Sequence, residues 1–258
     1  MSAVTVDAVV TGHPDGPTVV LSNSLGSDRR MWDAQLPELE KHFRVVRYDT
    51  RGHGRSPVPD GAATIDDLAD DLIALLDRLD IASCHLVGLS LGGMTAMRVA
   101  MRVPARVDRM VLLCTGAQLP PRSGWIERAA LVREHGTSAV AESVVGRWFT
   151  PSYLESEPDR RRFYEAMVAA TPSAGYAACC EAIADLDLRE GLSSITAPTL
   201  SIAGADDVAT PPAKLEEIVS AIPDARLLVV PESAHLANAQ QPQIITPAII
   251  DHLEGSDG

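Results

Sequence analysis

The sequence contains no apolar run that approaches the roughly 20 residues of a membrane-spanning helix. Its first five residues lack the basic and apolar regions of a signal peptide. The four cysteines, Cys84, Cys114, Cys179 and Cys180, show no metal-ligand spacing, and the first two lie inside apolar runs, as buried free thiols do. We therefore expect a cytoplasmic protein that neither spans a membrane nor holds a metal at its cysteines.

Positive charge is also in deficit. The sequence has 22 Lys and Arg residues against 35 Asp and Glu residues, which gives a formal net charge of −13. This balance argues against nucleic acid and anionic membranes as partners. No internal repeat or low-complexity tract is present, and 258 residues suit one large domain or a domain with an insertion. The sequence makes no prediction of the oligomeric state.

Short apolar runs alternate with helix-like segments along much of the chain. Near-continuous apolar stretches are typical of parallel strands that are covered on both faces. The clearest helical segment is 65–79, where Thr64 and Asp67 can form a capping box. This alternation predicts an α/β fold with a mostly parallel, doubly wound sheet. The expected strands are 18–21, 43–48, 85–88, 110–114, 200–203 and 227–230.

The alternation stops after Cys114 and returns at Thr199. Between them the patterns indicate helices at 125–135, 138–148, 158–170 and 176–185. We interpret residues 118–194 as an inserted helical segment, called here the cap segment. The α/β core is then formed by residues 1–117 and 195–258.

A six-residue motif, Gly-Leu-Ser-Leu-Gly-Gly at 88–93, carries the strongest functional signal. It follows an apolar run and precedes a helix-like stretch, so it matches the G-x-S-x-G nucleophile elbow of α/β-hydrolases. Such a turn strains the backbone of Ser90 and exposes its hydroxyl, with small residues needed two positions before and after it. The alternative interpretation is an ordinary glycine-rich turn.

A serine nucleophile at neutral pH needs a base, and the base needs an orienting carboxylate. Asp206 and Asp207 follow the predicted strand 200–203, and His235 follows the predicted strand 227–230. The chain order Ser90, Asp206 or Asp207, then His235 is that of α/β-hydrolases. The other histidines fit worse; His53, in a glycine-rich turn, is better explained as a structural residue.

Two other residues are expected to form the oxyanion hole, which requires two amide donors. One donor is the N–H of Leu91, directly after the nucleophile. The other is the N–H of Leu25, in the loop that follows the strand 18–21. Asp49, which also follows a strand, precedes Ser90 in the chain and is expected to be structural, pairing with Arg51.

With these motifs the chain resembles the 3-oxoadipate enol-lactonases. The similarity extends from Val19 to Pro242. Its most particular parts are the SNSLG loop (22–26), RWFTPSY (147–153) and GYAACCEAIADLDLR (175–189), while RGHG (51–54) and the elbow are widespread among α/β-hydrolases.

The resemblance implies a triad of Ser90, Asp207 and His235, and the opening of an anionic enol-lactone to 3-oxoadipate through an acyl-enzyme. No cofactor or metal is implied. Relatives often carry a histidine where this chain has Asp206, so two adjacent acids compete for one role. The acid commonly stands three residues after the strand-ending glycine, here Gly204, which favours Asp207.

The substrate carboxylate requires a cation despite the negative net charge. Arginine suits a carboxylate because it can bind both oxygens at once. Arg128 is the first candidate because it lies one helical turn after Trp125, so both can face the pocket. Arg147 beside Trp148 is the second. Ser24 in the oxyanion loop is a further substrate-binding candidate.

Two other functions remain possible from the sequence. One is another carboxylic-ester or carbon–carbon bond hydrolase of aromatic catabolism. The other is a non-catalytic ligand-binding receptor on the same fold, which the intact triad and its flanking glycines disfavour. A haloalkane dehalogenase would carry Asp at position 90 instead of Ser.

Overall fold

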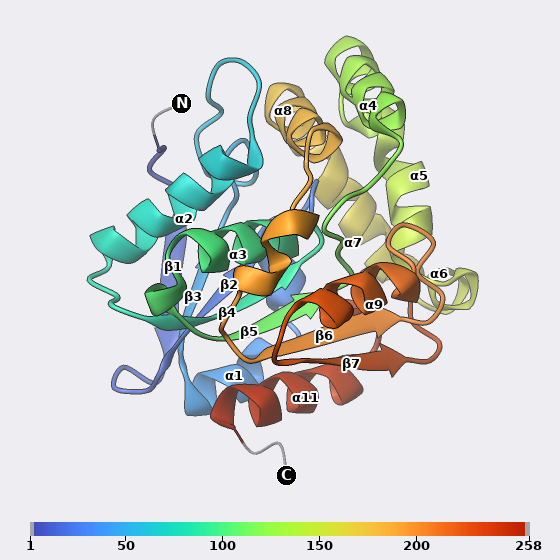
Figure 1. Ribbon diagram of the computed structural model, residues 1–258. Coiled ribbons are helices and arrows are strands. Elements are labelled where there is room, and N and C mark those ends of the chain that lie inside the picture. The colour runs from blue at the N-terminus through green and yellow to red at the C-terminus, as the bar shows by residue number, and fades with distance from the viewer. Residues whose placement is uncertain (1–2, 256–258) are drawn as a thin grey trace.

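The computed structural model describes residues 3–255 and is built around a seven-stranded sheet (Figure 1). The strand order is β1-β3-β2-β4-β5-β6-β7, with β1 antiparallel to β3 and all other pairs parallel. The predicted fold class is thereby confirmed. The strands are β1 (Ala8–Gly12), β2 (Thr18–Ser22), β3 (Arg44–Tyr48), β4 (Cys84–Leu89), β5 (Val107–Leu113), β6 (Thr199–Gly204) and β7 (Ala225–Val230).

The central strands β4 and β6 are buried along their whole length. Their apolar side chains point alternately to the two faces of the sheet, and helices cover both faces. Helices α2 (Ile65–Arg78), α3 (Leu91–Arg102) and α9 (Pro212–Ala221) lie on one face, and α1 (Leu36–His42) and α11 (Pro242–Glu254) lie on the other (Figure 1). The short helix α10 (Ala237–Gln240) precedes α11.

Helix α2 begins as the sequence predicts. The Thr64 side chain accepts a hydrogen bond from the Asp67 amide, and the Asp67 carboxylate accepts one from the Thr64 amide. The two bonds satisfy amides that have no partner within the helix. The leucines at 68, 72, 75 and 76 are buried along one stripe of the helix.

Five α-helices and a 3-10 helix (Arg189–Ser194) occupy the cap segment between β5 and β6, and in Figure 1 the α-helices lie beyond the carboxyl ends of the strands. Helix α4 packs against α8, and α5 packs against α7. The short α6 was not predicted from the sequence. The division into core and cap stays a prediction. The helices are α4 (Arg122–His135), α5 (Ser138–Trp148), α6 (Pro151–Ser156), α7 (Pro158–Ala169) and α8 (Ser173–Ala184).

One contact brings the cap segment very close to the core. Gly175 in α8 lies against Gly52 in the turn after β3, and a Cβ atom on Gly175 would lie 2.2 Å from the Gly52 carbonyl oxygen. Only two glycines allow the backbones to approach so closely. The contact holds α8 directly above the RGHG turn.

Two further findings concern burial and the membrane. Cys84 and Cys114 are buried free thiols, as expected, and Cys179 and Cys180 are also buried and unbridged. Within residues 3–255, no helix has the length and apolar character needed to cross a membrane. The α/β core predicted from the sequence (1–117 and 195–258) also includes residues 1, 2 and 256–258, which lie outside the described residues.

Candidate active site

Ser90 lies at the sharp turn between β4 and α3. Its backbone has φ 57° and ψ −116°, a conformation that L-residues rarely adopt and that costs roughly 1–3 kcal/mol. Close backbone contacts require the flanking glycines: a Cβ atom on Gly88 would lie 2.3 Å from the Gly92 carbonyl oxygen, and one on Gly92 would lie 2.2 Å from the Ser22 carbonyl oxygen. A larger residue at Gly88 would collide with the first turn of α3, and one at Gly92 would push the turn away from β2.

The loops after β6 and β7 bring an acid and a histidine together. The Asp207 carboxylate (Oδ2) lies 2.8 Å from His235 Nδ1. Its other oxygen accepts hydrogen bonds from the amides of Ala209 (2.7 Å) and Thr210 (3.0 Å). Asp206, by contrast, is exposed to solvent. The structure therefore places Asp207, and not its neighbour, against His235.

The environment of Asp207 keeps it ionised. Burial by itself would raise the pKa of this carboxyl, but the interaction with His235 and the hydrogen bonds from His235 and Thr210 outweigh burial and lower the pKa to about 2. An ionised Asp207 can only accept, so His235 Nδ1 carries the hydrogen and donates it to Asp207 Oδ2. The other ring nitrogen, Nε2, is then unprotonated and can accept a proton in the cavity.

Thr210 was missed as a site residue. Its hydroxyl donates a hydrogen bond to Asp207 Oδ2 at 2.7 Å and lies 3.1 Å from His235 Nδ1. The hydroxyl therefore holds the same carboxylate oxygen that faces the histidine. The only sequence signal was its place three residues after Asp207, in the segment that resembles the enol-lactonases.

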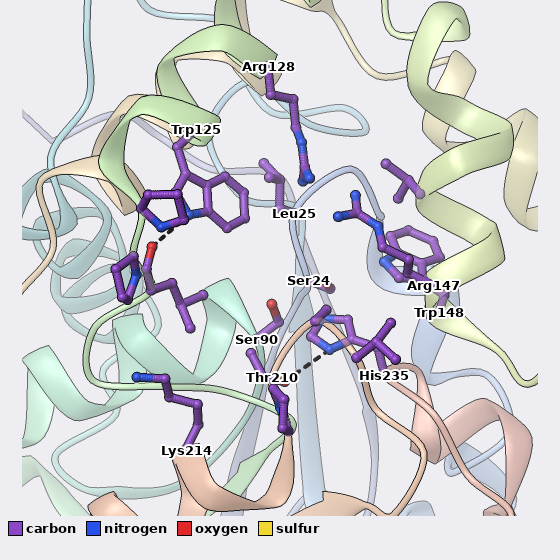
Figure 2. A pocket seen from close by; sticks show the side chains of 18 of the residues that line it. Ser24, Leu25, Ser90, Trp125, Arg128, Arg147, Trp148, Thr210, Lys214 and His235 are labelled. Atoms are coloured by element: carbon purple, nitrogen blue, oxygen red, sulfur yellow. Dashed lines mark hydrogen bonds between the residues drawn. The ribbon is translucent and has the colours of Figure 1, made fainter.

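Ser90 and His235 line one cavity of about 400 Å³ beneath the cap segment (Figure 2). Leu25, expected in the oxyanion hole, and all five predicted substrate-binding residues lie in its wall with them. The five are Ser24, Trp125, Arg128, Arg147 and Trp148. Leu119, Tyr176 and Lys214 also line the cavity and were not predicted; their positions depend on how the cap segment and α9 pack.

The two expected amide donors have no competing acceptor. Leu91 is the first residue of α3, so its N–H belongs to the helix end that has no partner within the helix and favours negative charge. The Leu25 amide donates no hydrogen bond to any of the described residues. Their role as oxyanion donors stays a prediction.

The cavity is cationic although the chain is acidic. Figure 2 shows the guanidinium groups of Arg128 and Arg147 pointing toward each other across the cavity. The Arg128 guanidinium also stacks 4.7 Å from the ring centre of Trp125. Burial and the nearby charge of Arg128 lower the pKa of Arg147. No Asp or Glu is among the described residues that line this cavity.

Tyr176 adds an unsatisfied polar group beside the two arginines. Its buried hydroxyl completes no hydrogen bond of normal geometry with the described residues. Burial raises the pKa of Tyr176 to about 12, while the nearby Arg128 acts in the opposite direction. The hydroxyl is therefore a neutral group that a ligand could engage.

The expected pairing of Asp49 with Arg51 is wrong. Arg51 forms a buried ion pair with Asp71 of α2, with Nε 2.5 Å from Oδ2. Asp49 instead accepts hydrogen bonds from the backbone amides of Arg29 (2.9 Å) and Arg55 (3.0 Å). The carboxylate thus fixes two loops at the carboxyl end of β3, which agrees with the structural role expected for it.

Comparison with known proteins places this site in a family. The model of the α/β hydrolase fold family matches residues 17–242, so the chain belongs to that family. The 3-oxoadipate enol-lactonase 2 of Acinetobacter baylyi is 37% identical over 246 residues, which cover 95% of this chain and 92% of that protein. The chain is therefore a member of the 3-oxoadipate enol-lactonase family and is a hydrolase, as its motifs indicated.

Two further relatives bear on the function. The crystal structure of the enol-lactonase from Burkholderia xenovorans has a TM-score of 0.94 and 39% identity, with 96% of each chain covered. A putative carbamate hydrolase, RutD, of Stutzerimonas stutzeri is 29% identical over 247 residues, with 93% of each chain covered. The wider set of relatives thus includes two substrate classes.

Proposed function

We propose that this protein opens 3-oxoadipate enol-lactone to 3-oxoadipate through an acyl-enzyme on Ser90, as a cytoplasmic step in the degradation of aromatic compounds. The observation that carries the proposal is the paired arginines in a cavity that also holds Ser90 and His235. A neutral ester would leave two like charges facing each other. A lactone with a free carboxylate would neutralise them.

The proposed chemistry uses the groups that meet at this cavity. His235 Nε2 takes the proton of Ser90 as Oγ bonds to the lactone carbonyl carbon. The N–H groups of Leu25 and Leu91 stabilise the negative oxygen of the tetrahedral intermediate. The ring C–O bond then breaks, and His235 returns the proton to the departing enol oxygen, which becomes a ketone after tautomerisation.

The second half of the reaction regenerates the enzyme. His235 takes a proton from water as the water oxygen attacks the acyl carbon. The ester bond to Ser90 then breaks, and Oγ recovers the proton while the new carboxylic acid leaves. Asp207 stays ionised throughout and stabilises the imidazolium that forms in each half.

The carboxylate arm of the lactone is assigned to the arginine pair. Arg128 is held by the Trp125 ring and Arg147 by its half-buried position in α5, so little side-chain freedom is lost when an anion binds. The Tyr176 hydroxyl, which completes no normal hydrogen bond with the described residues, can donate to the same group. The lactone carbonyl of the substrate then faces Ser90, while its free carboxylate binds to the arginine pair.

The first experiment measures the substrate class. Purified protein is assayed on 3-oxoadipate enol-lactone by the loss of ultraviolet absorbance, beside p-nitrophenyl acetate and a simple carbamate. We expect the highest kcat/KM on the lactone. We also expect Ser90→Ala to reduce turnover by about 10⁴ or more while the protein stays folded. A higher kcat/KM on the carbamate, or Ser90→Ala activity within tenfold of the parent, would overturn the proposal.

The second experiment measures the carboxylate anchor. Arg128→Met and Arg147→Met are each assayed on the lactone and on p-nitrophenyl acetate. Loss of a charged hydrogen bond predicts a fall in kcat/KM of roughly tenfold or more on the lactone, with the neutral ester nearly unchanged. Equal losses on both substrates, or no loss on either, would contradict the assignment.

A further inference from the structure

The structure assigns to His53 a role beyond the integrity of its own turn: it acts as a hydrogen-bond acceptor that positions the oxyanion loop (residues 22–26). This inference rests on the proposed serine mechanism, because it concerns the Leu25 amide. His53 does not touch the substrate cavity. It is a positioning residue that acts through the backbone of the loop.

Two hydrogen bonds fix the ring of His53. Its Nδ1 lies 3.0 Å from the carbonyl oxygen of Arg51. Its Nε2 lies 3.0 Å from the backbone nitrogen of Gly26, whose N–H can only donate. The carbonyl can only accept, so Nδ1 carries the hydrogen and Nε2 carries the lone pair. One tautomer of the neutral ring satisfies both partners.

The surroundings of His53 favour that neutral ring. The side chain is fully buried. Burial lowers the pKa of His53, and the nearby carboxylates of Asp49 and Asp28, together with the hydrogen bond to Arg51, only partly oppose this effect. A protonated ring would also place an Nε2–H against the Gly26 N–H. The turn therefore presents an acceptor to the loop at neutral pH.

The accepted N–H belongs to the residue directly after Leu25. On the other side of Leu25, the Ser24 amide donates to Met31 Sδ at 3.3 Å. The Leu25 peptide is thus held from both sides, and its own N–H is left free for the cavity. Gly26 has φ +78°, and a Cβ there would lie 2.8 Å from the Tyr176 ring, so this loop conformation requires glycine at position 26.

The two expected oxyanion amides are thus positioned by different parts of the structure. Helix α3 fixes the Leu91 amide through its own backbone, but the Leu25 amide lies in a loop and needs an external support. His53 supplies that support from the RGHG turn, which Gly52 presses against the cap segment. The Ser27 amide closes the turn around this peptide by donating to the Ser24 carbonyl at 3.2 Å. Without the Nε2 lone pair, the buried Gly26 N–H has no acceptor, and the Leu25–Gly26 peptide loses the hydrogen bond that fixes its orientation within that turn.

Two substitutions separate the two ring nitrogens. In His53→Gln, the side-chain carbonyl reaches the Nε2 position and can accept from Gly26. In His53→Asn, the shorter amide reaches only the Nδ1 position and can donate to Arg51. We expect His53→Gln to retain kcat within about fivefold, and His53→Asn to lose roughly 10–100-fold in kcat, below the 10²–10³ of a deleted oxyanion donor, with little change in KM.

The assay uses p-nitrophenyl acetate, so that its outcome does not depend on the natural substrate. The affinity for phenylboronic acid, which forms a tetrahedral adduct on serine, is measured beside it and should weaken in parallel with kcat in His53→Asn. Equal losses in the two variants, or a greater loss in His53→Gln, would overturn the inference. Retained activity in Ser90→Ala, run in the same series, would instead overturn the proposed function.

A measurement on the unmodified protein covers the case in which both variants fail to fold. The ¹⁵N chemical shifts of the His53 ring at neutral pH report which nitrogen carries hydrogen. We expect a protonated Nδ1 and an unprotonated Nε2. The opposite tautomer, or a doubly protonated ring, would exclude the acceptor role, because Nε2 could not then receive the Gly26 N–H.

Discussion

The adjacent acids Asp206 and Asp207 offer a sharp test of the site, because the same substitution can be made one residue apart. In Asp207→Asn, the side-chain oxygen can keep the hydrogen bonds from the amides of Ala209 and Thr210. The amide nitrogen then replaces the oxygen that faces His235 at 2.8 Å. That nitrogen donates, so His235 must turn an unprotonated Nδ1 toward it.

The cost follows from this change of tautomer. With Nδ1 unprotonated, the hydrogen moves to Nε2, and the ring can no longer accept the proton of Ser90. The corresponding substitution in a well-studied serine protease, which also leaves the histidine in the wrong tautomer, lowers kcat by about 10⁴. At about 1.4 kcal/mol per decade, that is about 5 kcal/mol of transition-state stabilisation. We expect a loss of this order for Asp207→Asn.

Asp206→Asn is the matched control. The Asp206 side chain is exposed, and its backbone amide, which the substitution retains, donates to the Ser233 carbonyl at 2.9 Å. We expect kcat/KM within about threefold of the parent, the scale of a surface change. Both variants are assayed on p-nitrophenyl acetate and on enol-lactone, with circular dichroism to verify folding. A greater loss in Asp206→Asn than in Asp207→Asn would refute the reasoning.

Three further predictions concern the surroundings of the site. Because the pKa of Asp207 is lower in the folded protein than in the unfolded chain, its ionised form stabilises the fold above pH 4. Between pH 4 and pH 2, the free energy of unfolding should therefore fall by about 2 kcal/mol more in the parent than in Asp207→Asn. Thr210→Val should lower kcat about tenfold, the scale of a hydrogen bond to a charged group, and Thr210→Ser should restore it. In urea denaturation, Gly175→Ala should destabilise the protein by about 1–3 kcal/mol, whereas Gly146→Ala, where a Cβ meets nothing within 4 Å, should not.

Contrary results would be equally specific. Identical acid stability in the parent and Asp207→Asn would mean that the carboxylate gains nothing from its partners. Full activity in Thr210→Val would remove the hydroxyl from the support of Asp207. Equal destabilisation by Gly175→Ala and Gly146→Ala would mean that the contact between α8 and the RGHG turn is not tight.

The residues around Ser90 could be predicted from the sequence because their geometry is local. A tight turn between a strand and a helix needs small residues at Gly88 and Gly92, whatever the rest of the chain does. The loops that hold Asp207 and His235 follow apolar strands, and parallel strands bring their carboxyl ends to one edge of a sheet. Pattern and topology together therefore place these side chains near one another.

The remaining features depend on contacts that no local pattern encodes. Arg51 was expected to pair with Asp49, two residues away, but it pairs with Asp71 because α2 packs its buried face beside the turn. Lys214 and Tyr176 line the cavity only because α9 and α8 approach it from separate parts of the chain. The antiparallel strand β1 was also missed, because five residues at an edge carry a weak apolar pattern.

The arrangement of charge explains how an acidic chain could accept an anion. At physiological salt, charges beyond about 8 Å are largely screened, so most of the net charge of −13 acts weakly inside the cavity. Asp207 is the acid closest to the reaction, and its charge is engaged by His235 and by the amides of its own loop. The opposing guanidinium groups of Arg128 and Arg147 therefore dominate the field where the carboxylate is proposed to bind, and distant surface acids need not be removed for the site to work.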